Sequence, residues 1–101
     1  MTGSSNGQGP FKVIVSEQIK ETIKTLHERA KQLDQGVQFL ATLRRIFERL
    51  QRDPQGFGEP LFRLPALNLM VLHVVVSRVV IHYGVHQEKP LVIIRNVTFL
   101  D

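Results

Sequence analysis

The chain has 101 residues, of which 43% are hydrophobic and 22% charged, the size and composition of one folded domain. It contains no cysteine, which excludes disulfides, thiolate metal sites and a cysteine nucleophile. The formal net charge of +4 suits an RNA, DNA or acidic protein partner, and a modest surface charge without such a partner explains it equally well.

Residues 1–10 are rich in glycine, serine and asparagine, and this composition predicts a mobile tail. They lack the basic and apolar regions of a signal peptide, and no apolar run in the chain reaches the length that spans a bilayer. The absence of cysteine fits a reducing compartment, so we expect a cytoplasmic protein with no membrane segment. A single domain over residues 11–101 accounts for the remainder.

A short strand and two amphipathic helices come first along the chain. Residues 11–15 are largely β-branched and predict a strand, and Ser16 is suited to cap a helix over residues 17–33. Asp34 is a candidate cap for a second helix over residues 35–51. That helix has a predicted buried stripe of Phe39, Leu43, Ile46 and Leu50. The two helices form a predicted helical hairpin.

The last third of the chain is predicted to be strand. Residues 53–60 are dense in turn-forming types and predict a loop, while residues 61–68 have no assignment beyond extended backbone at Leu64-Pro65. Runs rich in β-branched residues predict three strands, at residues 69–75, 78–85 and 91–98. The order β-α-α-β-β-β predicts an α+β domain in which the helical hairpin packs on one face of a small antiparallel sheet.

The middle strands are more apolar than a sheet covered on one face requires. One alternation is wholly apolar and is predicted to face the helices: Met70, Leu72, Val74, Val79, Ile81, Tyr83 and Val85. The other would expose three valines, Val71, Val75 and Val80, around the polar residues of the same face. Monomers rarely expose a large contiguous apolar patch, so these valines are candidate contacts for a partner chain or a second copy in a homodimer. The alternative is that residues 53–68 fold over the face.

Three polar residues of the predicted open face are candidates for catalysis: His73, Arg78 and His82. A two-residue turn at Val76-Ser77 would place the histidines diagonally on adjacent strands, within reach of Arg78. Two imidazoles beside a guanidinium suit general acid–base chemistry on a phosphodiester. Hydrogen bonding within an interface is the more common role for such a cluster. No carboxylate nearby in the sequence completes a metal site, and no motif implies a cofactor.

A row of arginines lines one side of the second predicted helix, at Arg45, Arg49 and Arg52. A row of positive charge is a candidate phosphate-binding site. Glu48 lies four residues from both Arg44 and Arg52, so ion pairs on a solvated helix face are the alternative.

Several stretches, in order, resemble the RelE/ParE superfamily of bacterial, plasmid-stabilisation-like toxins. They are the opening strand and cap at 11–16, the second helix and the "DP" that closes it at 39–54, the Gly-x-Pro-Leu segment at 58–65, the strand at 78–85 that resembles "R-Y-R-V-I-Y-x-V", and Arg95-Asn96-Val97. The resemblance covers nearly all of the chain after Pro10. It implies a toxin neutralised by a cognate antitoxin, with no cofactor. It also implies either ribosome-dependent mRNA cleavage, as in RelE, or inhibition of DNA gyrase, as in ParE.

The residues that the resemblance assigns to RNA cleavage are mostly replaced. Positions that are basic in RelE-like toxins fall on Val71, His73, Val80 and Leu100, and no tyrosine follows Leu100. The resemblance therefore favours a ParE-like or catalytically degenerate toxin that acts by protein binding. Two alternatives stay open. One is a RelE-type ribosome-dependent endonuclease that uses His73, Arg78 and His82, and the other is a non-toxic interaction module with the same fold.

Overall fold

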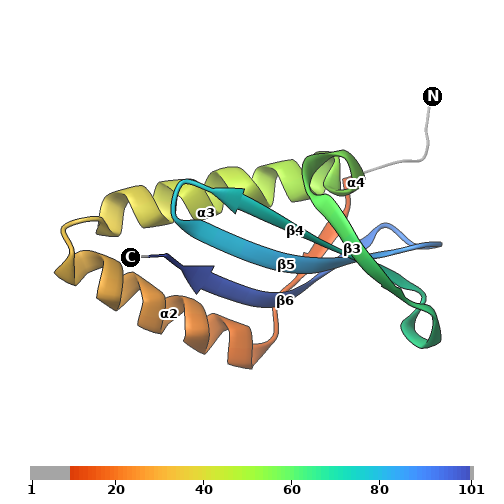
Figure 1. The fold of residues 1–101 in the computed structure, drawn as a ribbon, viewed down its shortest axis with the longest axis horizontal. Helices are drawn as coiled ribbons and strands as arrows, with labels where there is room; N and C mark the ends of the chain where they lie inside the picture. Colours follow the sequence, from red (N-terminus) through yellow and green to blue (C-terminus); the bar gives the residue numbers. More distant parts are fainter. Residues whose placement is uncertain (1–9, 101) are drawn as a thin grey trace.

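The computed structural model describes residues 10–100, so the predicted tail lies outside the described residues except for Pro10 (Figure 1). The elements are β2 (Lys12–Ile14), α2 (Glu17–Gln32), α3 (Gly36–Arg52), α4 (Pro54–Phe57), β3 (Glu59–Leu64), the 3-10 turn η1 (Pro65–Leu67), β4 (Leu69–Val76), β5 (Val79–His86) and β6 (Leu91–Phe99). In the described residues, no helix is long and apolar enough to cross a membrane.

The two long helices form the predicted hairpin, with one local difference. Ser16 caps α2 as expected, because its Oγ accepts a hydrogen bond of 3.1 Å from the backbone N–H of Ile19. The prediction that Asp34 caps α3 is wrong. Asp34 has a φ of 61°, in the left-handed region, where it reverses the chain after α2, and Gln35 precedes α3 without a side-chain hydrogen bond.

The helices pack on one face of a five-stranded sheet with the order β2-β6-β5-β4-β3. The strands β4, β5 and β6 are antiparallel, as predicted, and an unpredicted strand, β3, pairs antiparallel with β4. The short strand β2 adds a parallel pairing at the edge, where Lys12 lies opposite Leu91 and Ile14 opposite Ile93. The predicted α+β class is confirmed.

Strand β3 occupies the segment that sequence patterns left unassigned. Its register with β4 shifts between Pro60 and Phe62, and this irregularity interrupts the alternation by which a strand is recognised. Proline is tolerated there because β3 is an edge strand, whose outer N–H groups need no ladder partner. The segment therefore extends the sheet beside β4. The alternative in which residues 53–68 cover the open face is wrong.

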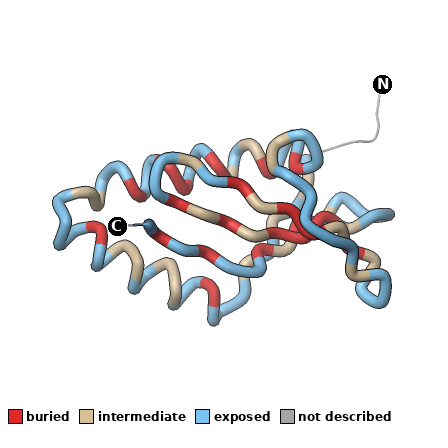
Figure 2. Tube along the Cα trace, viewed as in Figure 1, coloured by how far each residue is buried: buried red, intermediate tan, exposed pale blue. Residues whose placement is uncertain are grey.

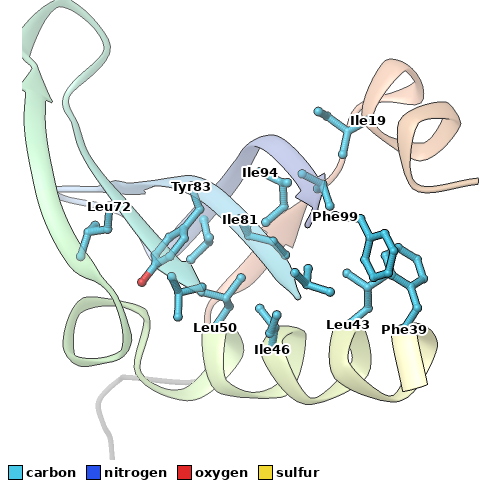
Figure 3. Close-up of a cluster of buried hydrophobic side chains, with 14 of the residues drawn as sticks. Ile19, Phe39, Leu43, Ile46, Leu50, Leu72, Ile81, Tyr83, Ile94 and Phe99 are labelled. Carbon is cyan, nitrogen blue, oxygen red and sulfur yellow. The ribbon is translucent and has the colours of Figure 1, made fainter. Parts of the chain in front are cut away.

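One hydrophobic core lies between the helices and the sheet. The α3 stripe of Phe39, Leu43, Ile46 and Leu50 is buried, as predicted. Figure 3 shows these side chains pointing toward the labelled side chains of β5 and β6. The core includes the predicted helix-facing residues of the central strands, with Met70 packed against it from a partly buried position. Figure 2 shows the resulting change between buried and less buried positions along the strands.

Tyr83 fastens α4 and the start of β3 to this core. Its side chain is fully buried, and its hydroxyl donates a hydrogen bond of 2.7 Å to the backbone carbonyl of Pro54. Gly58 lies so close that an added Cβ would stand 2.5 Å from the Tyr83 hydroxyl and 2.6 Å from the backbone oxygen of His73. Burial disfavours the charged phenolate and raises the pKa of Tyr83 to about 12.

The chain has one tyrosine and no tryptophan, so ultraviolet absorbance follows the ionisation of Tyr83 without interference. We expect a midpoint near pH 12 in the folded protein, in place of 10.0. Because folding raises this pKa, the contribution of Tyr83 to stability is complete below pH 10 and is lost as the pH rises toward 12. Tyr83→Phe should remove the titration and lower the free energy of unfolding by about 1–2 kcal/mol. A midpoint near 10 before unfolding would contradict this assignment.

Candidate functional site

The face of the sheet opposite the helices, here called the outer face, presents a short series of cross-strand pairs. On β4 and β5 these pairs are Val75 with Val80, then His73 with His82, then Val71 with Gly84. The outer face therefore gathers most of the residues that the sequence singled out for partner binding and for catalysis.

His73 and His82 lie directly opposite each other, closer than predicted. The two-residue turn between β4 and β5 is Ser77-Arg78 instead of Val76-Ser77, and Ser77 adopts a φ of 54° there. This shift of one residue turns a diagonal arrangement into a direct pair. The ring centroids are 5.8 Å apart, and the ring planes are inclined by 32°.

Two further polar residues extend the pair into a row that crosses four strands. Glu59 on β3 lies opposite His73, and Asn96 on β6 lies opposite His82. Glu59, His73, His82 and Asn96 are named the polar row. The Oε1 atom of Glu59 is 3.9 Å from Nε2 of His73. Sequence analysis missed Glu59 and Asn96 because only the strand register places them beside the histidines.

Each histidine of the polar row turns one ring nitrogen inward. The Nδ1 atoms of His73 and His82 are buried and have no hydrogen-bond partner among the described residues. His73 keeps 28% of its side chain exposed, next to a Glu59 side chain that is 85% exposed. Nε2 is therefore the remaining ring nitrogen for contact with a ligand.

Arg78 does not join the histidines, so the predicted three-residue cluster is not assembled. Arg78 is exposed in the turn, four residues from His82, which corresponds to about 13 Å along a strand. It lines a pocket with Phe39 and Thr42 of α3, on the helix side of the sheet. The arginine nearest to the row in sequence, Arg95, lines a hollow beside the start of α2, and Asn96 of the polar row lines the same hollow.

The three predicted partner-binding valines differ in exposure. Val75 is 53% exposed and Val80 is half-buried, but Val71 is only 1% exposed, so its assignment to an exposed face is wrong. Val71 lies opposite Gly84, which has no side chain, and Leu69 leans into the vacant space: a Cβ on Gly84 would stand 3.0 Å from Cδ1 of Leu69. Neighbouring side chains thus close over this end of the outer face.

Phe62 is an exposed apolar residue of the outer face that sequence analysis missed. It is 51% exposed and pairs with Val71, which places it on the same side of the sheet. The signal that could have identified Phe62 was the group of apolar residues within 61–64. The prolines on either side of this segment obscured its strand pattern.

The arginines Arg45, Arg49 and Arg52 do come together, although away from the outer face. They line one pocket on α3, with Phe57 of α4 at its side. The guanidinium carbon of Arg49 lies 4.7 Å from the centroid of the Phe57 ring, a cation–π contact. Within residues 10–100, no three histidine, aspartate or glutamate side chains are grouped to hold a metal ion.

Comparison with known proteins connects this fold to a solved complex. No protein-family model matches the chain, and no curated protein matches it significantly. A chain in the crystal structure of the toxin–antitoxin complex RelBE2 from Mycobacterium tuberculosis has a similar structure, with a TM-score of 0.64 and 21% sequence identity. The similarity covers 89% of this chain and 98% of that chain. At this identity it establishes a shared fold.

The different environments of Val71 and Val75 lead to a matched pair of substitutions. Val71→Asp should lower the free energy of unfolding by about 3 kcal/mol or more, because it buries a carboxylate without a partner. Val75→Asp should cost no more than about 1 kcal/mol, because that side chain is exposed. Urea denaturation followed by circular dichroism measures both values. Equal losses would show that the two positions are equally buried.

Proposed function

We propose that this protein is the toxin of a type II toxin–antitoxin system, that a cognate antitoxin binds its outer face, and that it inhibits a cytoplasmic target by binding. The fold shared with a chain of a toxin–antitoxin complex supports this class. The composition of the outer face is the observation that supports a mode of action by binding. This face exposes apolar side chains around hydrogen-bonding groups, and the positions that the resemblance assigns to RNA cleavage carry no arginine or lysine.

The composition of the outer face suits a protein partner. Phe62 and Val75 are each about half exposed, and His73 and His82 lie half-buried between them. Interfaces bury such aromatic and aliphatic anchors together with a few hydrogen-bonding groups. An antitoxin segment that covers these side chains and donates to or accepts from Nε2 of the histidines would remove the exposed apolar surface.

RNA cleavage in the manner of RelE has little support from the geometry. Cleavage of a phosphodiester needs positive charge where negative charge develops, as well as an acid and a base. Of the positions that the resemblance assigns to cleavage, Val71 is a buried valine, Val80 is also apolar, and only His73 carries a titratable side chain. Arg78 lies at the far end of the strand, toward the helix side.

One observation favours a second candidate function, that of an mRNA endonuclease. The Glu59 carboxylate lies 3.9 Å from Nε2 of His73, and His82 stands directly across the strand pair. Two imidazoles side by side, with a carboxylate near one of them, are groups that can serve as a general base and a general acid. This candidate requires the histidines to transfer protons, whereas the proposed function requires them only to form hydrogen bonds.

Controlled expression in a bacterial host distinguishes these functions. We expect growth arrest in which DNA synthesis falls before protein synthesis, as for a gyrase-directed toxin that acts by binding. A variant with His73→Gln and His82→Gln keeps hydrogen-bonding groups but loses acid–base capacity, so its toxicity should be unchanged. A second variant with alanine at both positions removes the hydrogen bonds as well, and circular dichroism verifies that both variants fold.

Two of three other outcomes would contradict the proposal, and a fall in protein synthesis would change the expected target. If the glutamine variant folds but no longer arrests growth, the histidines act chemically and the endonuclease assignment replaces the proposed one. If protein synthesis falls first, the target is the ribosome or its mRNA. If the expressed, folded chain does not slow growth at all, the fold serves a non-toxic interaction module.

A further inference from the structure

A second surface lies on the helix side of the molecule. Three arginines of α3, Arg45, Arg49 and Arg52, line a pocket whose apolar floor is formed by the half-buried Phe57 and Val76. Glu48 is the one acidic residue of the lining. We name this feature the arginine pocket. It combines concentrated positive charge with apolar surface, a combination absent from the outer face.

We propose that the arginine pocket binds an acidic protein segment that carries an apolar side chain. The apolar side chain would pack on the floor of the pocket, and flanking carboxylates would pair with the arginines. This inference is independent of the proposed function, because the pocket lies on the other side of the sheet from the polar row and requires no toxic activity.

The arginines are available for such a ligand. No ion pair joins Arg45, Arg49 or Arg52 to an acidic group in the described part of the chain, although Glu48 lies within the same lining. The predicted pairing of Glu48 with Arg44 or Arg52 is thus not formed. Three guanidinium groups against one carboxylate leave an excess of positive charge at the pocket. Guanidinium groups bind carboxylates through paired hydrogen bonds, which gives direction as well as attraction.

Phe57 gives the pocket a defined shape. Its ring contacts the guanidinium group of Arg49 at 4.7 Å, which restricts that side chain while leaving its N–H edges free to donate. Arg45 and Arg52 are exposed and lie seven residues apart, about 10 Å along the helix axis. Carboxylates on either side of one apolar side chain in a peptide would span a similar distance.

The apolar floor favours a protein segment over a nucleic acid. A bare phosphate has no apolar group to bury on Phe57 and Val76. A nucleobase would need an open aromatic face, but the guanidinium group of Arg49 already covers one face of Phe57. Glu48 also opposes the closely spaced charges of a phosphate chain. A leucine- or phenylalanine-like side chain between carboxylates matches both parts of the lining.

Fluorescence anisotropy with the full chain tests this assignment. The probe is a labelled peptide in which a single leucine is flanked by glutamates; a peptide with serine in place of leucine and an oligouridylate of equal charge are compared with it. The double variant Arg45→Ala/Arg52→Ala should lower the affinity for the leucine probe about tenfold or more, since it removes charge-assisted hydrogen bonds. The serine probe should bind the unaltered protein about tenfold more weakly, through loss of the apolar contact.

The matched control is Arg44→Ala/Arg63→Ala, which removes the same charge from exposed arginines outside the pocket. It should change the affinity less than about threefold, the effect of distant screened charge. An equal loss in both double variants would mean that the peptide senses only net charge, and the assignment would fail. Tighter binding of the oligouridylate, lost with Arg45→Ala/Arg52→Ala, would make the pocket a phosphate site instead. Arg49 is left unchanged because its contact with Phe57 contributes to packing.

Discussion

The burial of one face of the sheet against α3 is the constraint from which the other features follow. Phe39, Ile46 and Leu50 of α3 pack on the inward residues of β5 and β6, and Tyr83 closes the end of this layer by its hydrogen bond to Pro54. Successive residues of a strand point to opposite faces, so a slip of one residue would move the entire apolar set to solvent. The register of the sheet is therefore strongly determined by its inward face.

That register assembles the polar row as a consequence of the core. Val74 opposite Ile81 and Leu72 opposite Tyr83 are inward pairs, and the pair between them, His73 with His82, must then face outward. The same register brings Glu59 and Asn96 beside the histidines from the two flanking strands. Apolar residues on the opposite face thus mainly specify the polar row. Substitutions in the core would change the geometry of the row without replacing any of its residues.

Elements that local burial patterns determine were predicted from the sequence, whereas features that depend on pairing between strands were not. Amphipathic stripes and β-rich runs predicted α2, α3 and the three long strands, because each pattern is a local record of which face is buried. Strand β3 was missed because Pro60 and the shifted pairing after it obscure the alternation. The burial of Val71 was not predictable from its own neighbourhood, because it depends on the missing side chain of Gly84 on another strand. The turn between β4 and β5 was predicted one residue too early, and this error led to the incorrect placement of Arg78 beside the histidines.

The separation of titratable and cationic side chains is the physical basis for preferring binding to catalysis. The imidazoles of His73 and His82 face outward from the sheet, whereas the arginine pocket and Arg78 are associated with the helix side. A phosphodiester on the outer face would meet an acid–base pair without those cations, and one at the arginine pocket would meet cations without an acid–base pair. Each surface does have the mixture of apolar contact and directed polar groups by which proteins recognise other proteins.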